Sequence, residues 1–315
     1  MRGGTAALVA GLLAAGLLSG CGGTIERRTT PLPTLPAPRP QASQPVEPSP
    51  KPNPEPNSTS TPGPAPAPTS TPSRAPGADS RTVPPRWLGD RVLPTTGTGH
   101  GEVRATPPVL RNRQFTLPDT VPPLPGDDFA AQVTSPAPPA VIARSTWRPG
   151  CPVDASELTW LRLAFWGFDD RRHTGELLVH EDVASDLVSV FERLYKAKFP
   201  LEELSILTQG ELDAPPTGDG NATTAFVCRP TTGGTTYSQH AYGLAVDVNS
   251  FQNPYVSGDL VLPELASSYL HRAWNRPGMI EANGPVVQAF DSIKWEWGGS
   301  WETLKDYQHF SANGR

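Results

Sequence analysis

The chain has 315 residues, of which 29 are glycine and 39 are proline. Together these make up about 22% of the chain, compared with roughly 12% in ordinary globular proteins. Residues 31–80 hold 17 of the prolines and residues 81–149 hold 13, so we expect the compact domain in the second half. The net charge of −5, with 18% charged residues, argues against a sequence-independent nucleic-acid binder, and no nucleic-acid partner is expected.

The N-terminus has the features of an export signal. After a basic start, residues 6–18 form an apolar run that is too short to span a bilayer, which takes about 20 residues. The run ends in Leu18-Ser19-Gly20-Cys21, which resembles the lipobox of bacterial lipoproteins. This resemblance implies a lipoprotein signal peptide at residues 1–20 and acylation of Cys21, which would anchor the protein to the membrane. An ordinary signal peptide cut nearby, with Cys21 incidental, is the alternative.

Two further cysteines, Cys151 and Cys228, follow in the second half of the chain. In an exported protein, which meets an oxidising compartment, two remaining cysteines favour a disulfide between them. Two buried thiols or two soft metal ligands are the alternative. A metal site using both would need further Cys or His at short spacing, and neither cysteine has one.

Residues 21–80 and 81–145 differ in their apolar content. Residues 21–80 are rich in Pro, Ser, Thr and Ala and cannot bury enough apolar area to fold, so they are expected to form a disordered tether. Ligand motifs for proline-recognising modules are the rival interpretation of this stretch. Residues 81–145 contain Trp, Leu, Val and Phe without regular periodicity. We expect them to form an extended arm packed on the compact domain, unless they continue the tether.

Residues 146–315 carry the patterns of regular structure. Residues 158–166 alternate as in a strand, and the apolar spacing from Val183 to Leu194 predicts an amphipathic helix that ends before Pro200. Further short strands are expected at 204–207, 226–229, 243–248 and 295–301, with a loop at 210–224 and a short helix at 286–293. Mixed order and short strands indicate an α+β fold, with a small antiparallel sheet and flanking helices.

Two pairs of residues have side chains that can bind a metal ion or accept a proton beside it. His240 and Asp247 lie near a predicted strand entry, and Asp306 and His309 lie three positions apart. Two histidines and one carboxylate form the ligand set of a catalytic zinc with an open position for water, and Asp306 would then be placed to accept a proton. Each of these residues alone is more often structural. The remaining histidines are expected to be ordinary surface or core residues: His100, His173, His180 and His271.

These residues stand in three motifs: Ser238-x-His240-x-x-Gly243-x-Ala245-x-Asp247, Trp297-Gly298-Gly299-x-Trp301 and Asp306-x-x-His309-Phe310. Together the motifs resemble the zinc D-alanyl-D-alanine carboxypeptidase family. That family includes vancomycin-resistance dipeptidases and carboxypeptidases and phage L-alanyl-D-glutamate endolysins, and the chain looks most like secreted actinobacterial members. The resemblance implies the fold of the hedgehog and D,D-peptidase group and zinc ligation by His240, Asp247 and His309.

The same resemblance implies roles for residues around the metal. Asp306 would be the general base, and Arg229 would stabilise the oxyanion. Ser238 and Trp297 would contact the substrate. Asp306 stands where the vancomycin-resistance members have glutamate, and in this respect the chain resembles the endolysin branch. The resemblance therefore does not decide which peptide bond is cut.

The resemblance implies a cell-wall zinc metallopeptidase that hydrolyses peptidoglycan stem peptides. A D-alanyl-D-alanine carboxypeptidase is the first expectation. The alternatives are an L-alanyl-D-glutamate endopeptidase and a non-catalytic peptidoglycan-binding lipoprotein. We expect an extracytoplasmic monomer whose partners are the stem peptide and, through Cys21, the membrane.

Overall fold

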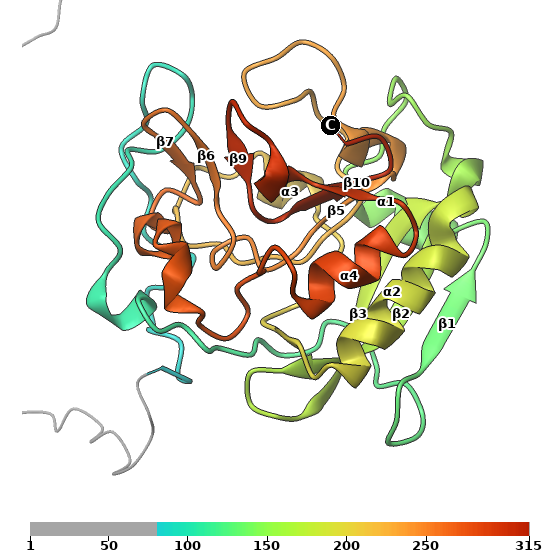
Figure 1. Ribbon diagram of the computed structural model, residues 1–315. Coiled ribbons are helices and arrows are strands. Elements are labelled where there is room, and N and C mark those ends of the chain that lie inside the picture. Colours follow the sequence, from blue (N-terminus) through green and yellow to red (C-terminus); the bar gives the residue numbers. More distant parts are fainter. Residues whose placement is uncertain (1–80, 315) are drawn as a thin grey trace, which may run out of the picture. The chain divides into compact units, whose positions relative to one another are not determined.

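The computed structural model describes residues 81–314 (Figure 1). All of them belong to one compact unit of the chain, Thr69–Arg315. The predicted signal peptide, the lipidation site Cys21 and the tether lie outside the described residues. Within residues 81–314, no helix has the length and apolar character needed to cross a membrane.

The largest sheet is built on a long antiparallel hairpin. Strand β2 (Leu158–Gly167) pairs with β3 (Arg172–His180) in a register that runs from Leu158 opposite His180 to Trp166 opposite Arg172. On the other edge of β2 lie β1 (Ala131–Thr134), which is antiparallel, and β4 (Pro200–Leu201), which is parallel. The alternating apolar pattern expected at 158–166 thus forms the central strand of this sheet.

One helix packs on this sheet, and a second helix packs beside the first. Helix α2 (Ala184–Lys196) follows a short 3-10 turn, and helix α4 (Pro285–Asp291) packs beside it (Figure 1). Helix α2 buries Leu187, Val190, Phe191 and Leu194, because a spacing of three and four residues places them on one face. They join the inner residues of β2 and β3 in the main hydrophobic core, which also contains Val246 of β5 (Ala245–Asp247) and Phe310 of β10 (His309–Ser311).

Two small sheets complete the fold. In the first, β10 (His309–Ser311) lies between β5 (Ala245–Asp247) and β8 (Glu296–Trp297). In the second, β6 (Tyr255–Ser257) lies between β7 (Leu260–Leu262) and β9 (Lys305–Asp306). Small, mainly antiparallel sheets with few helices agree with the predicted α+β class.

Some expected elements take another form. Residues 204–207 and 226–229 are not strands, although both run beside β3: Leu204 accepts the N–H of Glu176, and Phe226 donates to the carbonyl of Leu178. Single hydrogen bonds of this kind do not continue as a ladder. The expected loop at 210–224 begins within a short helix, α3 (Gln209–Leu212), which is capped by Thr208. Residues Gly298–Ser300 form a 3-10 turn and shorten the expected strand at 295–301.

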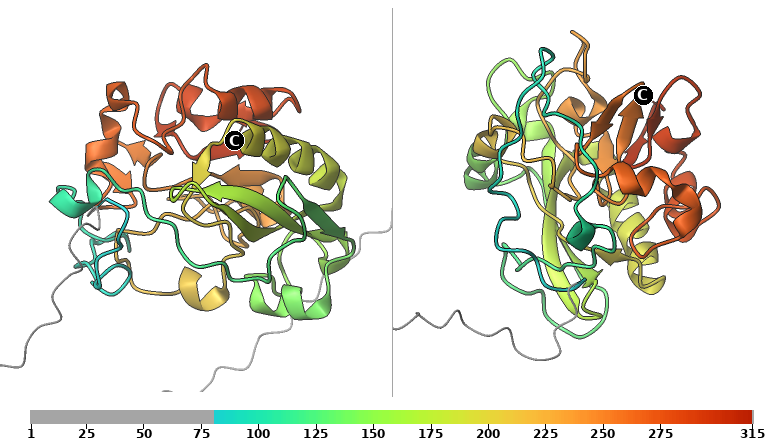
Figure 2. Two further views of the ribbon diagram at one scale, coloured as in Figure 1. Left: turned by 90° about the horizontal axis from the view of Figure 1, so that it is seen from below. Right: turned by 90° about the vertical axis from the view of Figure 1, so that its left-hand side faces the viewer.

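Residues 81–145 lie against the rest of the described chain (Figure 2). Leu110 and Phe115 are completely buried, in a cluster with residues of the β6–β7 region such as Val261 and Leu265. The segment contains a 3-10 turn (Pro108–Leu110), strand β1 and helix α1 (Pro139–Arg144). Its polar anchor is Arg113, which donates two hydrogen bonds, of 2.7 and 2.5 Å, to the carboxylate of the fully buried Glu202.

Cys151 and Cys228 form a disulfide with their Cα atoms 5.9 Å apart. The bond joins the segment after α1 to the residue that precedes Arg229. A second contact supports the same junction, because the Tyr237 hydroxyl donates to the carbonyl of Gly150 over 2.7 Å. The stretch from Arg229 to Tyr237 is therefore held at both ends by residues 150–151.

Candidate metal centre

Three side chains meet at the edge of the sheet formed by β5 and β10. His240 lies in a 3-10 turn (Gln239–Tyr242), Asp247 ends β5 and His309 begins β10. The antiparallel register places His309 directly opposite Asp247. The turn is capped by Ser238, whose hydroxyl accepts the N–H of His240 over 3.3 Å. The six residues between His240 and Asp247 thus provide the end of a turn and the entry to a strand.

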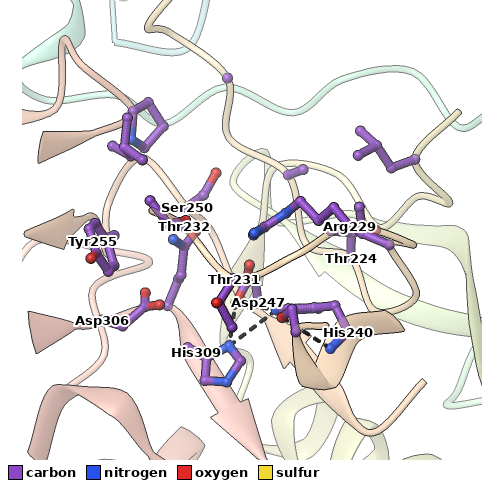
Figure 3. Close-up of a pocket in the computed structure, with 18 of the residues that line it drawn as sticks. Thr224, Arg229, Thr231, Thr232, His240, Asp247, Ser250, Tyr255, Asp306 and His309 are labelled. Carbon is purple, nitrogen blue, oxygen red and sulfur yellow. Dashed lines mark hydrogen bonds and ion pairs between the residues drawn. The ribbon is translucent and has the colours of Figure 1, made fainter. Parts of the chain in front are cut away.

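The ligand atoms of this cluster all lie within 4.8 Å of one another. His240 Nε2 is 3.1 Å from His309 Nδ1, and Asp247 Oδ1 is 3.2 Å from the former and 3.1 Å from the latter (Figure 3). Both histidines are buried, with 2% and 4% of their surface exposed. Two nitrogens and one carboxylate oxygen converging in this way fit the donor set of a divalent metal such as zinc.

Hydrogen bonding fixes the ring of His240 for ligation. Its Nδ1 lies 2.6 Å from the carbonyl oxygen of Ala225, which can only accept a hydrogen bond, so Nδ1 carries the proton. The lone pair of Nε2 then faces the cluster, as in metal-bound histidines whose second nitrogen donates to a carbonyl. Ala225 is placed by Thr224, which exchanges two backbone hydrogen bonds with Asp247.

The carboxylate of Asp247 is held ionised. Burial raises its pKa, but His240 and then His309, through hydrogen bonds and, when protonated, through their positive charge, outweigh that effect and hold the pKa well below its usual range. An ionised oxygen beside two imidazole nitrogens is the protonation state that metal binding requires.

Asp306 lies in the same cavity but outside the three-residue cluster. Figure 3 shows it on one side of the cluster, with Arg229 extending toward the cavity from another. Burial, and then the negative charge of Asp247, raise the pKa of Asp306 to about 7. A carboxyl group with such a pKa can both accept and release a proton near neutral pH.

Because position 298 is a glycine, the backbone there can lie very close to the backbone of Asp306. A Cβ atom at this position would lie 2.7 Å from the backbone oxygen of Asp306. The Gly-Gly turn of the predicted motif therefore permits β9 to lie against the end of β8. The Oδ1 atom of Asp306 is buried and has no hydrogen-bond partner within residues 81–314.

Of the residues predicted to contact the substrate, some border the cavity and one packs in the hydrophobic core. Arg229 and Ser238 border the cavity, and Arg229 Nη1 donates to the carbonyl of Pro230 over 3.0 Å. Trp297 does not border it: its indole N–H donates to the carbonyl of Tyr307 and its ring packs against the core at Phe310. Trp301 borders the cavity instead, with its ring 5.6 Å from that of His309.

The cavity has a volume of about 730 Å³ and extends well beyond the cluster. Besides Asp306 Oδ1, two buried polar atoms of lining residues, Thr224 Oγ1 and Trp301 Nε1, have no hydrogen-bond partner in the described part of the chain. Trp301 stands in one of the motifs, and this position could have identified it as a candidate cavity residue. Thr224 carries no such signal, because its position follows from the backbone pairing with Asp247.

Residues 232–312 match the family model described as D-alanyl-D-alanine carboxypeptidase. The match covers about a quarter of the chain, and Arg229 lies just before it. No curated protein and no solved structure gives a significant match. The matched segment contains His240, Asp247 and His309 together with Asp306, so the part of the chain that builds the candidate metal centre is the part that is similar to a peptidase family.

Proposed function

We propose that the protein is a zinc-dependent peptidase that hydrolyses peptidoglycan stem peptides, with D-alanyl-D-alanine carboxypeptidase activity as the first candidate. The observation that carries this proposal is the meeting of His240, Asp247 and His309 at one point beside Asp306, in a cavity of about 730 Å³. The match of residues 232–312 supports the peptidase class.

In the proposed hydrolysis, the metal ligands, Asp306 and Arg229 have separate roles. Zinc held by His240, Asp247 and His309 would supply Lewis-acid polarisation and lower the pKa of a water molecule. Asp306 accepts the proton of the attacking water and delivers it to the leaving amine, which its pKa of about 7 permits. The guanidinium of Arg229 stabilises the negative charge that develops on the carbonyl oxygen.

An L-alanyl-D-glutamate endopeptidase is the second candidate. Its support is the aspartate at position 306, which resembles the endolysin branch of the family. Either enzyme would act outside the cytoplasm, as a monomer held to the membrane through Cys21. This localisation is proposed from the sequence of residues 1–80 alone.

The two activities release different products from one substrate. The purified, zinc-loaded protein is incubated with a synthetic stem pentapeptide, and the products are identified by mass spectrometry. Release of the terminal D-alanine is expected for the first candidate, and cleavage after L-alanine for the second. The His240→Ala variant is the control that separates this activity from a contaminant. Binding without cleavage would favour the non-catalytic alternative and contradict the proposal.

A further inference from the structure

A buried carboxylate lines the cavity away from the metal centre. Glu264 follows β7, has 5% of its surface exposed and borders the cavity. Within residues 81–314 its side chain accepts one hydrogen bond, from the N–H of Gly101 to Oε1 over 2.6 Å, and has no ion pair with Lys, Arg or His. The second oxygen, Oε2, has no hydrogen-bond partner within these residues and is not sealed from solvent, so a ligand in the cavity can reach it.

The arm fixes this carboxylate from outside the cavity. The N–H of Arg104 donates to the backbone carbonyl of Glu264, while the N–H of Gly101 binds its side chain. A Cβ atom at position 101 would lie 2.8 Å from Oε1 of Glu264. A larger residue at position 101 would push the carboxylate away from the arm, whereas glycine lets the backbone N–H hold it before any ligand binds.

Strand register gives the position of Glu264 relative to the catalytic end of the cavity. Asp306 pairs with Tyr255, and Tyr255 pairs with Leu262, across β9, β6 and β7. Neighbouring strands are about 4.8 Å apart, so Leu262 is about 10 Å from Asp306, and Glu264 follows two residues later. An extended peptide covers about 3.3–3.6 Å per residue. A substrate group that meets Glu264 thus belongs to a residue within a few positions of the cleaved bond.

We infer that Glu264 is a specificity-determining residue that binds a primary ammonium group of the peptide substrate, such as the free side-chain amine of a diamino acid in the stem peptide. The inference rests on the proposed function for the identity of the peptide. An ammonium group supplies both the positive charge and the N–H donors that the buried carboxylate lacks.

The other glutamate on the cavity lining offers a matched control. Glu211 is exposed, and its Oε2 already accepts hydrogen bonds from the N–H and the hydroxyl of Thr208, over 2.8 and 2.7 Å. Its carboxylate is therefore open to solvent and hydrogen-bonded without a ligand. We therefore expect Glu211 to contribute little to amine recognition, although it borders the same cavity.

The experiment compares two stem peptides that differ only in the side-chain amine of the diamino acid, which is free in one and acetylated in the other. Turnover of both is measured with the zinc-loaded wild type, Glu264→Gln and Glu211→Gln. Wild type and Glu211→Gln should prefer the free amine by ~10–100-fold in kcat/KM, the range of a charge-assisted hydrogen bond. Glu264→Gln should lose this preference and keep its rate on the acetylated peptide.

The glutamine variant keeps an oxygen that can accept the Gly101 N–H, so its fold should be preserved, and its rate on the acetylated peptide reports this directly. Gly101→Ala is a second test, because it displaces the carboxylate without changing Glu264. It should weaken the preference for the free amine. Equal losses on both peptides in Glu264→Gln, or an unchanged preference, would overturn the inference.

A binding measurement separates this inference from the proposed function. Calorimetry with the Asp306→Asn variant, which should not cleave, gives the affinity for both peptides. If the wild type cleaves neither peptide, the proposed function fails, while an amine preference in binding that depends on Glu264 still supports the inference. Equal affinity for the two peptides overturns the inference even if both are cleaved.

Discussion

Two regions border the cavity, and they are built in opposite ways. On the metal side, His240 and Asp247 come from one short turn and strand, and His309 is added by a single strand pairing. On the arm side, residues 81–110 support a wall formed by residues more than a hundred positions away: Leu93 donates to the carbonyl of Pro216, and Gly101 donates to Glu264.

The difference shows how sequence patterns record the two kinds of construction. A metal site needs particular side chains at fixed spacing, and this leaves a motif. A packed arm needs only scattered apolar residues and a few backbone hydrogen bonds, and these leave no period. Changes on the metal side should therefore remove activity and spare the fold, whereas changes in the arm should lower the free energy of unfolding and spare the metal.

Replacing a metal ligand should have the largest effect. His240→Ala and His309→Ala each remove one of three ligands, so both should lose the bound metal and lower kcat/KM on the order of 10³-fold or more. Metal content by mass spectrometry and turnover of the stem peptide measure the two effects. Far-UV circular dichroism should remain that of the wild type. A variant that keeps full activity would show that the site lies elsewhere.

Asp306→Asn should separate metal binding from proton transfer. The amide cannot accept a proton, so turnover should fall by about 10²–10⁴-fold while the metal content stays unchanged. The same metal assay and peptide assay measure both. Loss of metal in this variant, with activity recovered on adding zinc, would instead make Asp306 a ligand.

Arg113→Leu should produce the largest loss of stability on the arm side. It leaves Glu202 buried without its cation, which costs about 3–5 kcal/mol. Urea denaturation of the full chain measures the change in the free energy of unfolding. Arg104→Leu breaks an exposed pair with Glu102 and is the matched control, with an expected change below about 1 kcal/mol. If both variants changed the free energy of unfolding equally, the buried pair of Arg113 and Glu202 would not be the anchor of the arm.

A smaller effect should appear as a pH dependence of stability at Glu203. Burial, and then the charge of Glu202, raise the pKa of Glu203 from 4.5 to about 7. The folded state therefore holds this proton more tightly than the unfolded state, and the resulting stability is present below about pH 4.5 and is lost as the pH rises through about 7.

Glu203→Gln removes this titration. Relative to wild type, the variant should gain about 1–3 kcal/mol in the free energy of unfolding between pH 5 and pH 8. Urea denaturation at both pH values measures the difference. Glu192→Gln, on the exposed face of α2, should change little across the same range. A wild type and a Glu203→Gln variant with parallel pH profiles would show that Glu203 titrates normally.

The sequence predicted the central strand, helix α2 and the residues of the metal cluster because each has a local signature. The period of α2 follows from its single buried face, and the ligands stand in short motifs. Strand β1 has no such signature, since most of its residues are exposed at the edge of the sheet. Its position depends on pairing with β2, which no pattern within residues 131–134 records.

The site shows the same division. His240 was found by motif, but the carbonyl of Ala225 that orients its ring was not, because a backbone oxygen carries no residue-specific signal. Trp301 and Trp297 stand four positions apart in one motif, and spacing alone does not tell which of them borders the cavity. Their orientations follow from the 3-10 turn at Gly298–Ser300, which turns the chain between them.

If the cluster of His240, Asp247 and His309 holds a metal as proposed, its metal affinity depends on the alignment of β5 with β10. His309 faces Asp247 only in the register that the structure has, and a slip of one residue would turn the imidazole to the opposite side of the sheet. Some sixty residues separate the two strands, and in the unfolded chain nothing holds them together. An ion that needs all three ligands therefore binds the correctly aligned sheet alone, and its binding free energy adds to the stability of that alignment over every slipped one.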